Sequence, residues 1–227
     1  MKFRYLLLTF LSVLCACNGT DNENEEEHFQ DTGKGVFILN EGNYNSGNST
    51  LSYYYPGEKR VENGIFLRSN DRKLGDTGQS MTLYNNTLFI AMENSGIVWG
   101  IDAETFRVKG QLTAAQTEHM INPRFVHIVN EGKAYVSDLY SPYITIFNPT
   151  TFQPFGSIHT GQPSANGYSS TENMVQYGNH VFTNCWSYSN KILAIDTRTD
   201  EVTDSIVLGS WQPKSMIVDA RGKLWVL

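Results

Sequence analysis

A short strand-like segment with a central aromatic residue recurs along this chain, and its period limits the folds that the sequence can adopt. The copies are Val36–Ile38, Leu88–Ile90, Ala134–Val136, Val181–Thr183 and Leu224–Val226. Their central residues are 52, 46, 47 and 43 positions apart. A turn signal after the next strand-like segment keeps a similar period, with steps of 46, 46 and 48 residues. These turns are Tyr55-Pro56, Ile101-Asp102, Phe147-Asn148 and Ile195-Asp196.

The segment Asn173–Gly209 shows what one repeat contains. Its strand-like runs, each bounded by turn residues, are Met174–Gln176, Val181–Thr183, Lys191–Ile195 and Val202–Leu208. Four strands in a period in the mid-forties predict an all-β fold, a β-propeller built of four-stranded antiparallel blades. An ordinary β-sandwich with coincidental turn spacing is the alternative, and two independent anchors with one period argue against it. The Trp-Asp and Gly-His signatures of WD40 repeats are missing from the sequence.

The repeats divide the chain after its first 34 residues into five units. We expect blades near 35–70, 78–115, 122–161, 170–209 and 212–227. The first unit begins with a segment that aligns with the second strand of a blade, and the last unit ends within its own second strand. About four and a half blades are therefore expected, whereas propellers close with typically four to eight. We interpret the chain as the front part of a seven-bladed protein of roughly 320 residues plus a leader.

The N-terminus has the features of a bacterial lipoprotein signal peptide at residues 1–16. A basic start, Met1–Arg4, precedes an apolar run, Tyr5–Ala16, which is too short to span a membrane. The run ends in Leu14-Cys15-Ala16-Cys17, which predicts cleavage before Cys17 and lipidation of that cysteine. A plain secretory signal with incidental cysteines is the alternative. The prediction places the protein at the outer membrane, held there by its lipid.

Residues 17–34 are rich in acidic and poor in apolar residues, so we expect a disordered tether. An acidic cluster behind a lipidated cysteine also resembles the export signal of surface-exposed lipoproteins, and a soluble spacer is the alternative. The formal net charge is −6. Removal of the leader with its Lys2 and Arg4 makes the mature chain −8, and the six acidic residues of the tether account for −6 of that, which leaves about −2 on the propeller. A nearly neutral body without a basic stripe argues against nucleic-acid binding.

The sequence offers no recognisable catalytic or metal-binding motif. His119 and His159 lack metal-ligand spacing to each other or to a cysteine, and neither a nucleophile elbow nor a glycine-rich phosphate loop occurs. We therefore expect no enzyme activity, no catalytic residues, no metal and no cofactor. A propeller lyase or lactonase that uses these histidines is the less favoured alternative. Cys185, the one cysteine beyond the leader, is expected to be buried at a strand end.

The loops predicted for the two faces of the propeller differ in length and composition. Loops after first and third strands are short turns of Asn, Asp and Gly, which reverse the chain. Loops after second and fourth strands are longer and combine aromatic residues with amides, the composition of a recognition surface. The candidate ligand-binding residues on that face are Asn43, Tyr44, Arg72, Asn94, Tyr140, Tyr143, Tyr168, Trp186, Tyr188 and Trp211. Trp99 and Trp225 lie within strands and are expected to pack between blades.

The segment Asn40–Tyr44 and the following Gly47–Tyr54 resemble the opening of the YncE-like propeller lipoproteins. More closely, the chain is similar to the BtuG-type surface lipoproteins, which bind cobalamin over a TonB-dependent vitamin B12 transporter. The resemblance spans residues 35–227 and implies a seven-bladed propeller. It also implies capture of cobalamin, as ligand and not as cofactor, and its transfer to a TonB-dependent outer-membrane receptor. A propeller that binds another nutrient, such as a glycan or a metal chelate, or that docks proteins, is the alternative.

Overall fold

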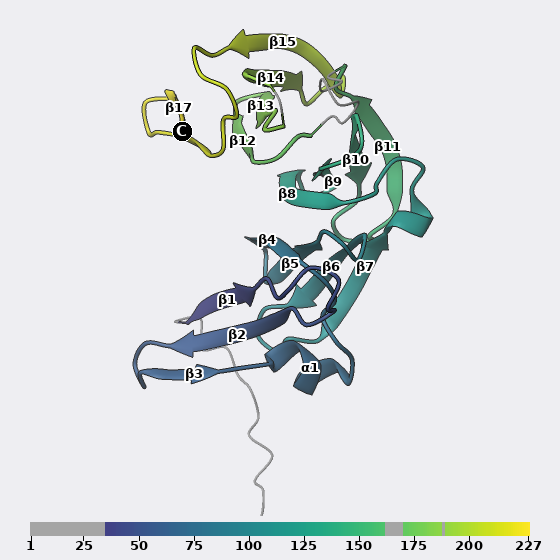
Figure 1. The fold of residues 1–227 in the computed structure, drawn as a ribbon, viewed down its shortest axis with the longest axis vertical. Coiled ribbons are helices and arrows are strands. Elements are labelled where there is room, and N and C mark those ends of the chain that lie inside the picture. The colour runs from purple at the N-terminus through teal and green to yellow at the C-terminus, as the bar shows by residue number, and fades with distance from the viewer. Residues whose placement is uncertain (1–34, 162–169, 188) are drawn as a thin grey trace, which may run out of the picture.

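The computed structural model describes residues 35–161, 170–187 and 189–227, which form five antiparallel sheets arranged along an arc (Figure 1). The first sheet has three strands, β1 (Val36–Asn40), β2 (Thr50–Tyr55) and β3 (Arg60–Glu62). The second contains β4 (Gly78–Tyr84), β5 (Thr87–Met92), β6 (Ile97–Asp102) and β7 (Val108–Thr113). The third contains β8 (Pro123–Asn130), β9 (Lys133–Asp138), β10 (Tyr143–Phe147) and β11 (Pro154–His159).

The fourth sheet contains β12 (Met174–Tyr177), β13 (His180–Asn184), β14 (Lys191–Asp196) and β15 (Glu201–Val207). The fifth has two strands, β16 (Met216–Val218) and β17 (Leu224–Val226). Consecutive strands pair in order within each sheet, with β4, β8 and β12 on the inner side of the arc and β7, β11 and β15 on its outer side (Figure 1). These four-stranded antiparallel sheets confirm the predicted propeller blades.

The hydrophobic core lies between the blades. Three clusters of buried side chains fill the spaces between the first and second, second and third, and third and fourth sheets. In β5, for example, Leu88 and Ile90 face the first blade, whereas Phe89 between them packs toward the third. A strand buried on both faces explains why the central segments of the repeats carry runs of apolar residues without polar alternation.

A short helix, α1 (Ile65–Asn70), follows the first sheet and was not predicted from the sequence. The strand before it, β3, has only three residues, and the helix buries Ile65 and Phe66 against the same core. Asn70 fixes the end of the helix, because its side-chain amide donates to the carbonyl oxygens of Phe66 and Phe106, each at 2.9 Å. The apolar pair and this amide bridge favour a helix here. A single turn of 3₁₀-helix, η1 (Ala114–Gln116), is also present.

The turns between third and fourth strands share one construction. Their first residue, Asp102, Asn148 or Asp196, accepts hydrogen bonds from backbone N–H groups two or three residues further on. Such self-capping is typical of Asp and Asn in turns. A left-handed backbone conformation falls on the fifth residue of each turn. These residues are Phe106, Phe152 and Asp200, with φ angles of 57°, 59° and 58°.

Each of these left-handed residues reaches back to the preceding blade. Phe106 packs edge-on against Phe37 of the first blade, with ring centroids 5.8 Å apart. Phe152 packs against Phe89 of the second blade at 5.8 Å. Asp200 instead accepts hydrogen bonds from Tyr135 and Lys133 of the third blade. The turns therefore connect blades as well as reverse the chain.

The two strand tryptophans have different environments. Trp99 is 4% exposed, packs against Phe66 and donates its indole N–H to the carbonyl oxygen of Leu74 at 2.8 Å. Its predicted position between blades is confirmed. Trp225 is 58% exposed and donates to the carboxylate of Asp219 within its own hairpin, so the prediction for this residue is wrong. No described element covers the face of the two-stranded fifth sheet on which its ring lies.

Cys185 is buried immediately after β13, as the sequence predicts, and burial raises the pKa of its thiol to about 12. We expect the folded protein to leave this thiol unmodified by Ellman's reagent at pH 8, because the thiolate is the reacting form. In guanidinium chloride the same thiol should react fully. The experiment uses a Cys15→Ser, Cys17→Ser variant, so that one thiol remains. Complete reaction of the native protein within minutes would contradict the buried position.

Candidate ligand-binding face

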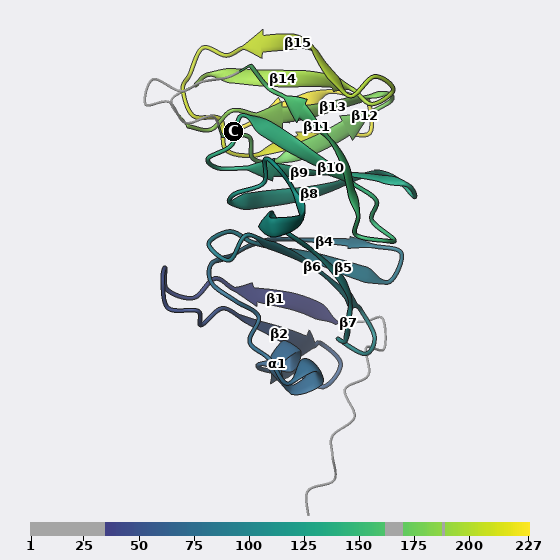
Figure 2. The same ribbon diagram turned by 90° about the vertical axis from the view of Figure 1, so that its right-hand side faces the viewer.

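The loops after second and fourth strands lie on one side of the arc. Figure 2 shows the β1–β2 loop projecting from this side and the β4–β5 turn on the opposite side. We call the first side the loop face. It contains 41–49, 93–96, 139–142, 185–187 and 189–190 together with the described parts of the connections between blades. The antiparallel order of strands within each blade fixes this separation, since alternate connections of a meander emerge at opposite edges of the sheet.

The β1–β2 loop is held by its own polar groups and by the second blade. The side-chain oxygen of Asn48 accepts the N–H of Asn43 at 2.8 Å, and Asn94 donates its amide to Asn45 at 2.8 Å. Of the predicted ligand residues, Asn43 and Asn94 therefore take part in fixing the loop. Tyr44 at its tip is 67% exposed. The arrangement presents one aromatic ring on a loop of defined shape.

The connection between the first two blades supports this loop through hydrogen bonds to Asp76. Asp76 accepts the N–H of Gly47 at 3.1 Å and the hydroxyl of Thr77 at 2.8 Å. Although partial desolvation acts in the opposite direction, these hydrogen bonds hold the pKa of Asp76 below its ordinary value. Arg72, another predicted ligand residue, lies with its guanidinium 4.4 Å from the centre of the Trp99 ring. This cation–π contact orients an exposed positive charge at the loop face.

In the third blade, Tyr143 is less available than predicted. It is half-buried, and the His119 ring stacks on it with centroids 3.8 Å apart, while His159 lies at 4.9 Å. Tyr140 is 45% exposed at the tip of the β9–β10 loop. Asp138 accepts the N–H groups of Tyr140 and Ser141 in that loop and those of Ile121 and Asn122 before β8, yet its burial raises the pKa of the carboxyl above its ordinary value.

In the fourth and fifth units, Trp211 is 68% exposed and Trp186 is half-buried. Their loops are joined by a hydrogen bond from the N–H of Gln212 to the carbonyl oxygen of Ser189 at 2.8 Å. Tyr168, Tyr188 and the expected lipidation site Cys17 lie outside the described residues. Tyr44, Tyr140 and Trp211 are exposed on three separate loops, so the face offers a wide set of aromatic contacts.

A buried charge cluster at the inner rim of the loop face was not found by sequence reasoning. Arg124, at the start of β8, makes ion pairs with Glu93 of the preceding blade and with Glu172 of the following one, the latter at 2.8 Å. Burial raises the pKa of Glu172, while Arg124 acts in the opposite direction. Glu93 and Glu172 lie 31 and 48 residues from Arg124 along the chain, so the three charges form no local sequence pattern. Only the ring arrangement of the blades brings them together.

The described residues contain no group of three histidine, cysteine, aspartate or glutamate side chains placed to hold a metal ion. They also contain no helix that is long and apolar enough to cross a membrane. The loop face presents aromatic rings, amides and one positioned guanidinium, a composition that suits recognition.

Solved structures similar to this chain are β-propellers. The Cps50 (Swd1) propeller domain of Myceliophteria thermophila aligns with 87% of this chain at 14% identity and a TM-score of 0.61. The WD40 propeller domain of Doa1 aligns with 81% at 11% identity and a TM-score of 0.56. BamB of Moraxella catarrhalis aligns with 87% at 11% identity and a TM-score of 0.53. The chain spans 60%, 58% and 59% of the lengths of these proteins.

A search among curated proteins found no match to this sequence. A family model does match, and it covers residues 34–227, from just before β1 to the last residue. The matched region contains all five sheets and both faces of the propeller. The chain therefore belongs to the family described as a domain of unknown function, DUF5074.

Proposed function

We propose that this protein is a lipid-anchored propeller of the outer membrane that binds cobalamin at the cell surface and passes it to a TonB-dependent transporter. The observation that carries the proposal is the loop face, where exposed aromatic rings stand among amides on loops held by their own hydrogen bonds. Cobalamin is large, amphipathic and fringed with amides. A wide face of this composition suits it better than a deep pocket.

Two features of the sequence support the anchoring and the ligand. The lipoprotein-like leader and the acidic segment behind it favour a tethered protein at the surface. The resemblance of Asn40–Tyr54 to the BtuG-type lipoproteins favours cobalamin over other nutrients. The propeller fold itself is consistent with a binding or docking platform and does not depend on either feature.

Isothermal titration of a soluble Cys17→Ser protein with cyanocobalamin tests the proposal. We expect saturable binding, and we expect a Trp186→Ala, Trp211→Ala double variant to bind about 10- to 100-fold more weakly, since aromatic anchors contribute most to such interfaces. Trp225→Ala is the matched control, because this exposed tryptophan lies in a strand away from the loop face. Absence of heat and of any absorbance change with the parent protein would overturn cobalamin as the ligand.

The β1–β2 loop favours a second candidate, a protein-docking platform. Tyr44 stands at the tip of a projecting, internally bonded loop, a geometry that suits insertion into a pocket of a partner rather than enclosure of a small molecule. Affinity capture with the lipidated protein distinguishes the candidates. Recovery of a transporter other than a cobalamin transporter, with loss of that partner in Tyr44→Ala, would favour docking of another system.

A further inference from the structure

The outer edge of β11 is not paired with any other described strand. The N–H of Thr160 donates to Pro142 at 2.9 Å, and the register pairs Ile144 with Ile158 and Thr145 with Ser157. Because inward and outward groups alternate along an antiparallel strand, Ile158 bonds to β10 while Ser157 and His159 turn their N–H and C=O groups outward. No backbone hydrogen bond from another described residue reaches these outward groups.

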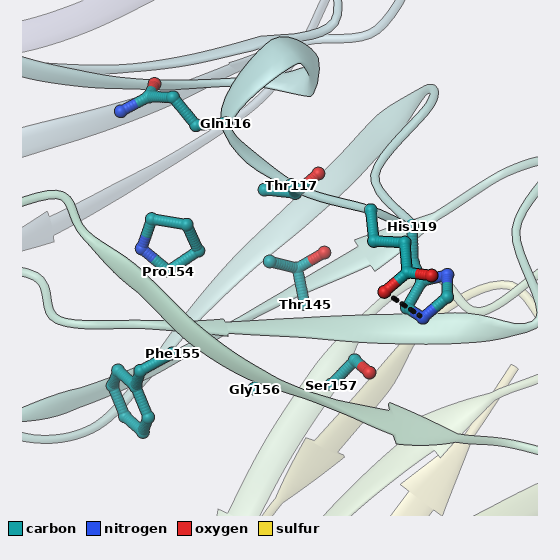
Figure 3. A pocket seen from close by; sticks show the side chains of 9 residues that line it. Gln116, Thr117, His119, Thr145, Pro154, Phe155, Gly156 and Ser157 are labelled. Carbon is teal, nitrogen blue, oxygen red and sulfur yellow. Dashed lines mark ion pairs between the residues drawn. The ribbon is translucent and has the colours of Figure 1, made fainter.

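A hollow of about 230 Å³ lies beside this edge on the face of the sheet that is directed toward the second blade. Figure 3 shows its two walls, with Gln116, Thr117 and His119 on one side and Pro154–Ser157 of β11 on the other. Thr145 and Ser157 are cross-strand partners, so both side chains lie on this face. We call this space the first hollow.

A second hollow, of about 580 Å³, lies beside the same edge on the other face of the sheet. Its lining includes Ile146 and Ile158, which belong to the core shared with the fourth blade, and Thr199–Val202 of that blade. Gly156 contributes no side chain to either space, and a glycine in a strand often marks close approach of another backbone. The edge of β11 is thus flanked by one hollow on each face.

The charges around both hollows have the same sign. No lysine or arginine lines either one. Glu201 at the second hollow is exposed and forms no ion pair with a described residue, and Glu118 at the first is 88% exposed with only His119 beside it. Asp200 is already bound by Lys133 and Tyr135. Each hollow thus has an exposed carboxylate without a lysine or arginine partner among the described residues, which favours a binding partner with basic side chains.

We propose that β11 is a docking site for an extended, basic segment of a partner protein, which adds to the third blade as a fifth strand. Backbone hydrogen bonds to Ser157 and His159 hold the segment, and its alternate side chains enter the first and second hollows. The opposite charge of Glu118 and Glu201 selects lysine or arginine. The site lies on the outer side of the arc (Figure 1), and its first hollow borrows Gln116–His119 from the connection between the second and third blades.

The probe is a displayed library of peptides of about ten residues with a central lysine or arginine, selected on the full chain. We expect enriched peptides that slow hydrogen exchange at the amides of Ser157 and His159, since no described residue accepts a backbone hydrogen bond from these amides in the unbound chain. Ser157→Pro should lower the affinity about tenfold or more, because it removes an outward N–H and leaves the β10 ladder intact. Ser157→Ala, which keeps that N–H, should bind within about twofold of the parent.

Glu201→Lys is a second variant, on β15. We expect it to weaken binding of the same peptides while leaving the backbone edge of β11 unchanged. Thermal unfolding of each variant shows whether it is folded. Enrichment of no peptide, or equal binding by Ser157→Pro and the parent, would overturn the proposal. Concentration-dependent self-association that Ser157→Pro abolishes would overturn it as well, since a second copy of the chain would then be the occupant.

Discussion

Phe152→Ala is expected to lower the free energy of unfolding by about 3–5 kcal/mol, the range for truncating a buried phenylalanine. The ring is 5% exposed and lies between Phe89 and Phe147, so its removal leaves a cavity between the second and third blades. Urea unfolding followed by tryptophan fluorescence measures the loss. Phe155→Ala is the control, because Phe155 is 58% exposed on the outer strand and should change stability by less than about 1 kcal/mol.

Two glycines of the second blade provide a second test of how the Phe152 ring packs. A Cβ atom at Gly100 or Gly110 would overlap the Phe152 ring, so the ring occupies the space that these glycines leave open. Gly110→Ala should therefore destabilise the parent protein but cost little in a Phe152→Ala background. A double-mutant cycle detects this coupling. Additive effects of the two substitutions would show that the Phe152 ring does not fill the space beside Gly110.

Arg124→Ala is expected to destabilise the protein by a similar amount, about 3–5 kcal/mol, because it leaves two carboxylates buried without their cation. The side chains of Arg124, Glu93 and Glu172 are only 14%, 10% and 7% exposed. Arg107→Ala is the matched control, since Arg107 is exposed and its side chain makes no ion pair with a described residue. Replacement of all three charged residues of the cluster by methionine should recover most of the loss.

The effect of Arg124→Ala should depend on pH. Without the guanidinium, burial and the charge of Glu93 raise the carboxyl pKa of Glu172 above its value in the unfolded chain. With a raised carboxyl pKa, the folded state binds a proton more tightly than the unfolded state does. The free energy of unfolding therefore falls as pH increases from the unfolded-state pKa through the raised value. The deficit of the variant should thus be small near pH 4 and largest near pH 7. A deficit that stays constant over this range would rule out buried carboxylates as its cause.

Much of the architecture could be predicted because it depends on local pattern and period. The aromatic centres near Phe89, Tyr135 and Phe182 mark central strands, and a strand buried between two neighbouring blades requires such residues. Asp102 and Asn148 begin turns, because their side chains accept backbone N–H groups a few residues away. Both signals act within one repeat and are therefore visible in the sequence.

The candidate site was predicted less completely. The sequence identified the loop face, and the structure places Tyr44, Tyr140 and Trp211 exposed on it. Tyr143 was predicted as a ligand residue with equal weight, but the ring of His119 covers one side of it. Composition predicts that a loop carries aromatic residues. It does not predict which of them pack on a neighbour, because the neighbour comes from another repeat.

The sequence by itself determined the period, from the spacing of the recurring segments. It also determined the blade content and the division into short turns and long loops, since strands and turns follow from neighbours within about ten residues. Only the tertiary structure decided the contacts between blades: Phe152 in the slot of Gly100 and Gly110, Arg124 between Glu93 and Glu172, and the free edge of β11 between two hollows. These contacts join residues of different repeats. Their partners are selected by the curvature of the arc, which no single repeat encodes.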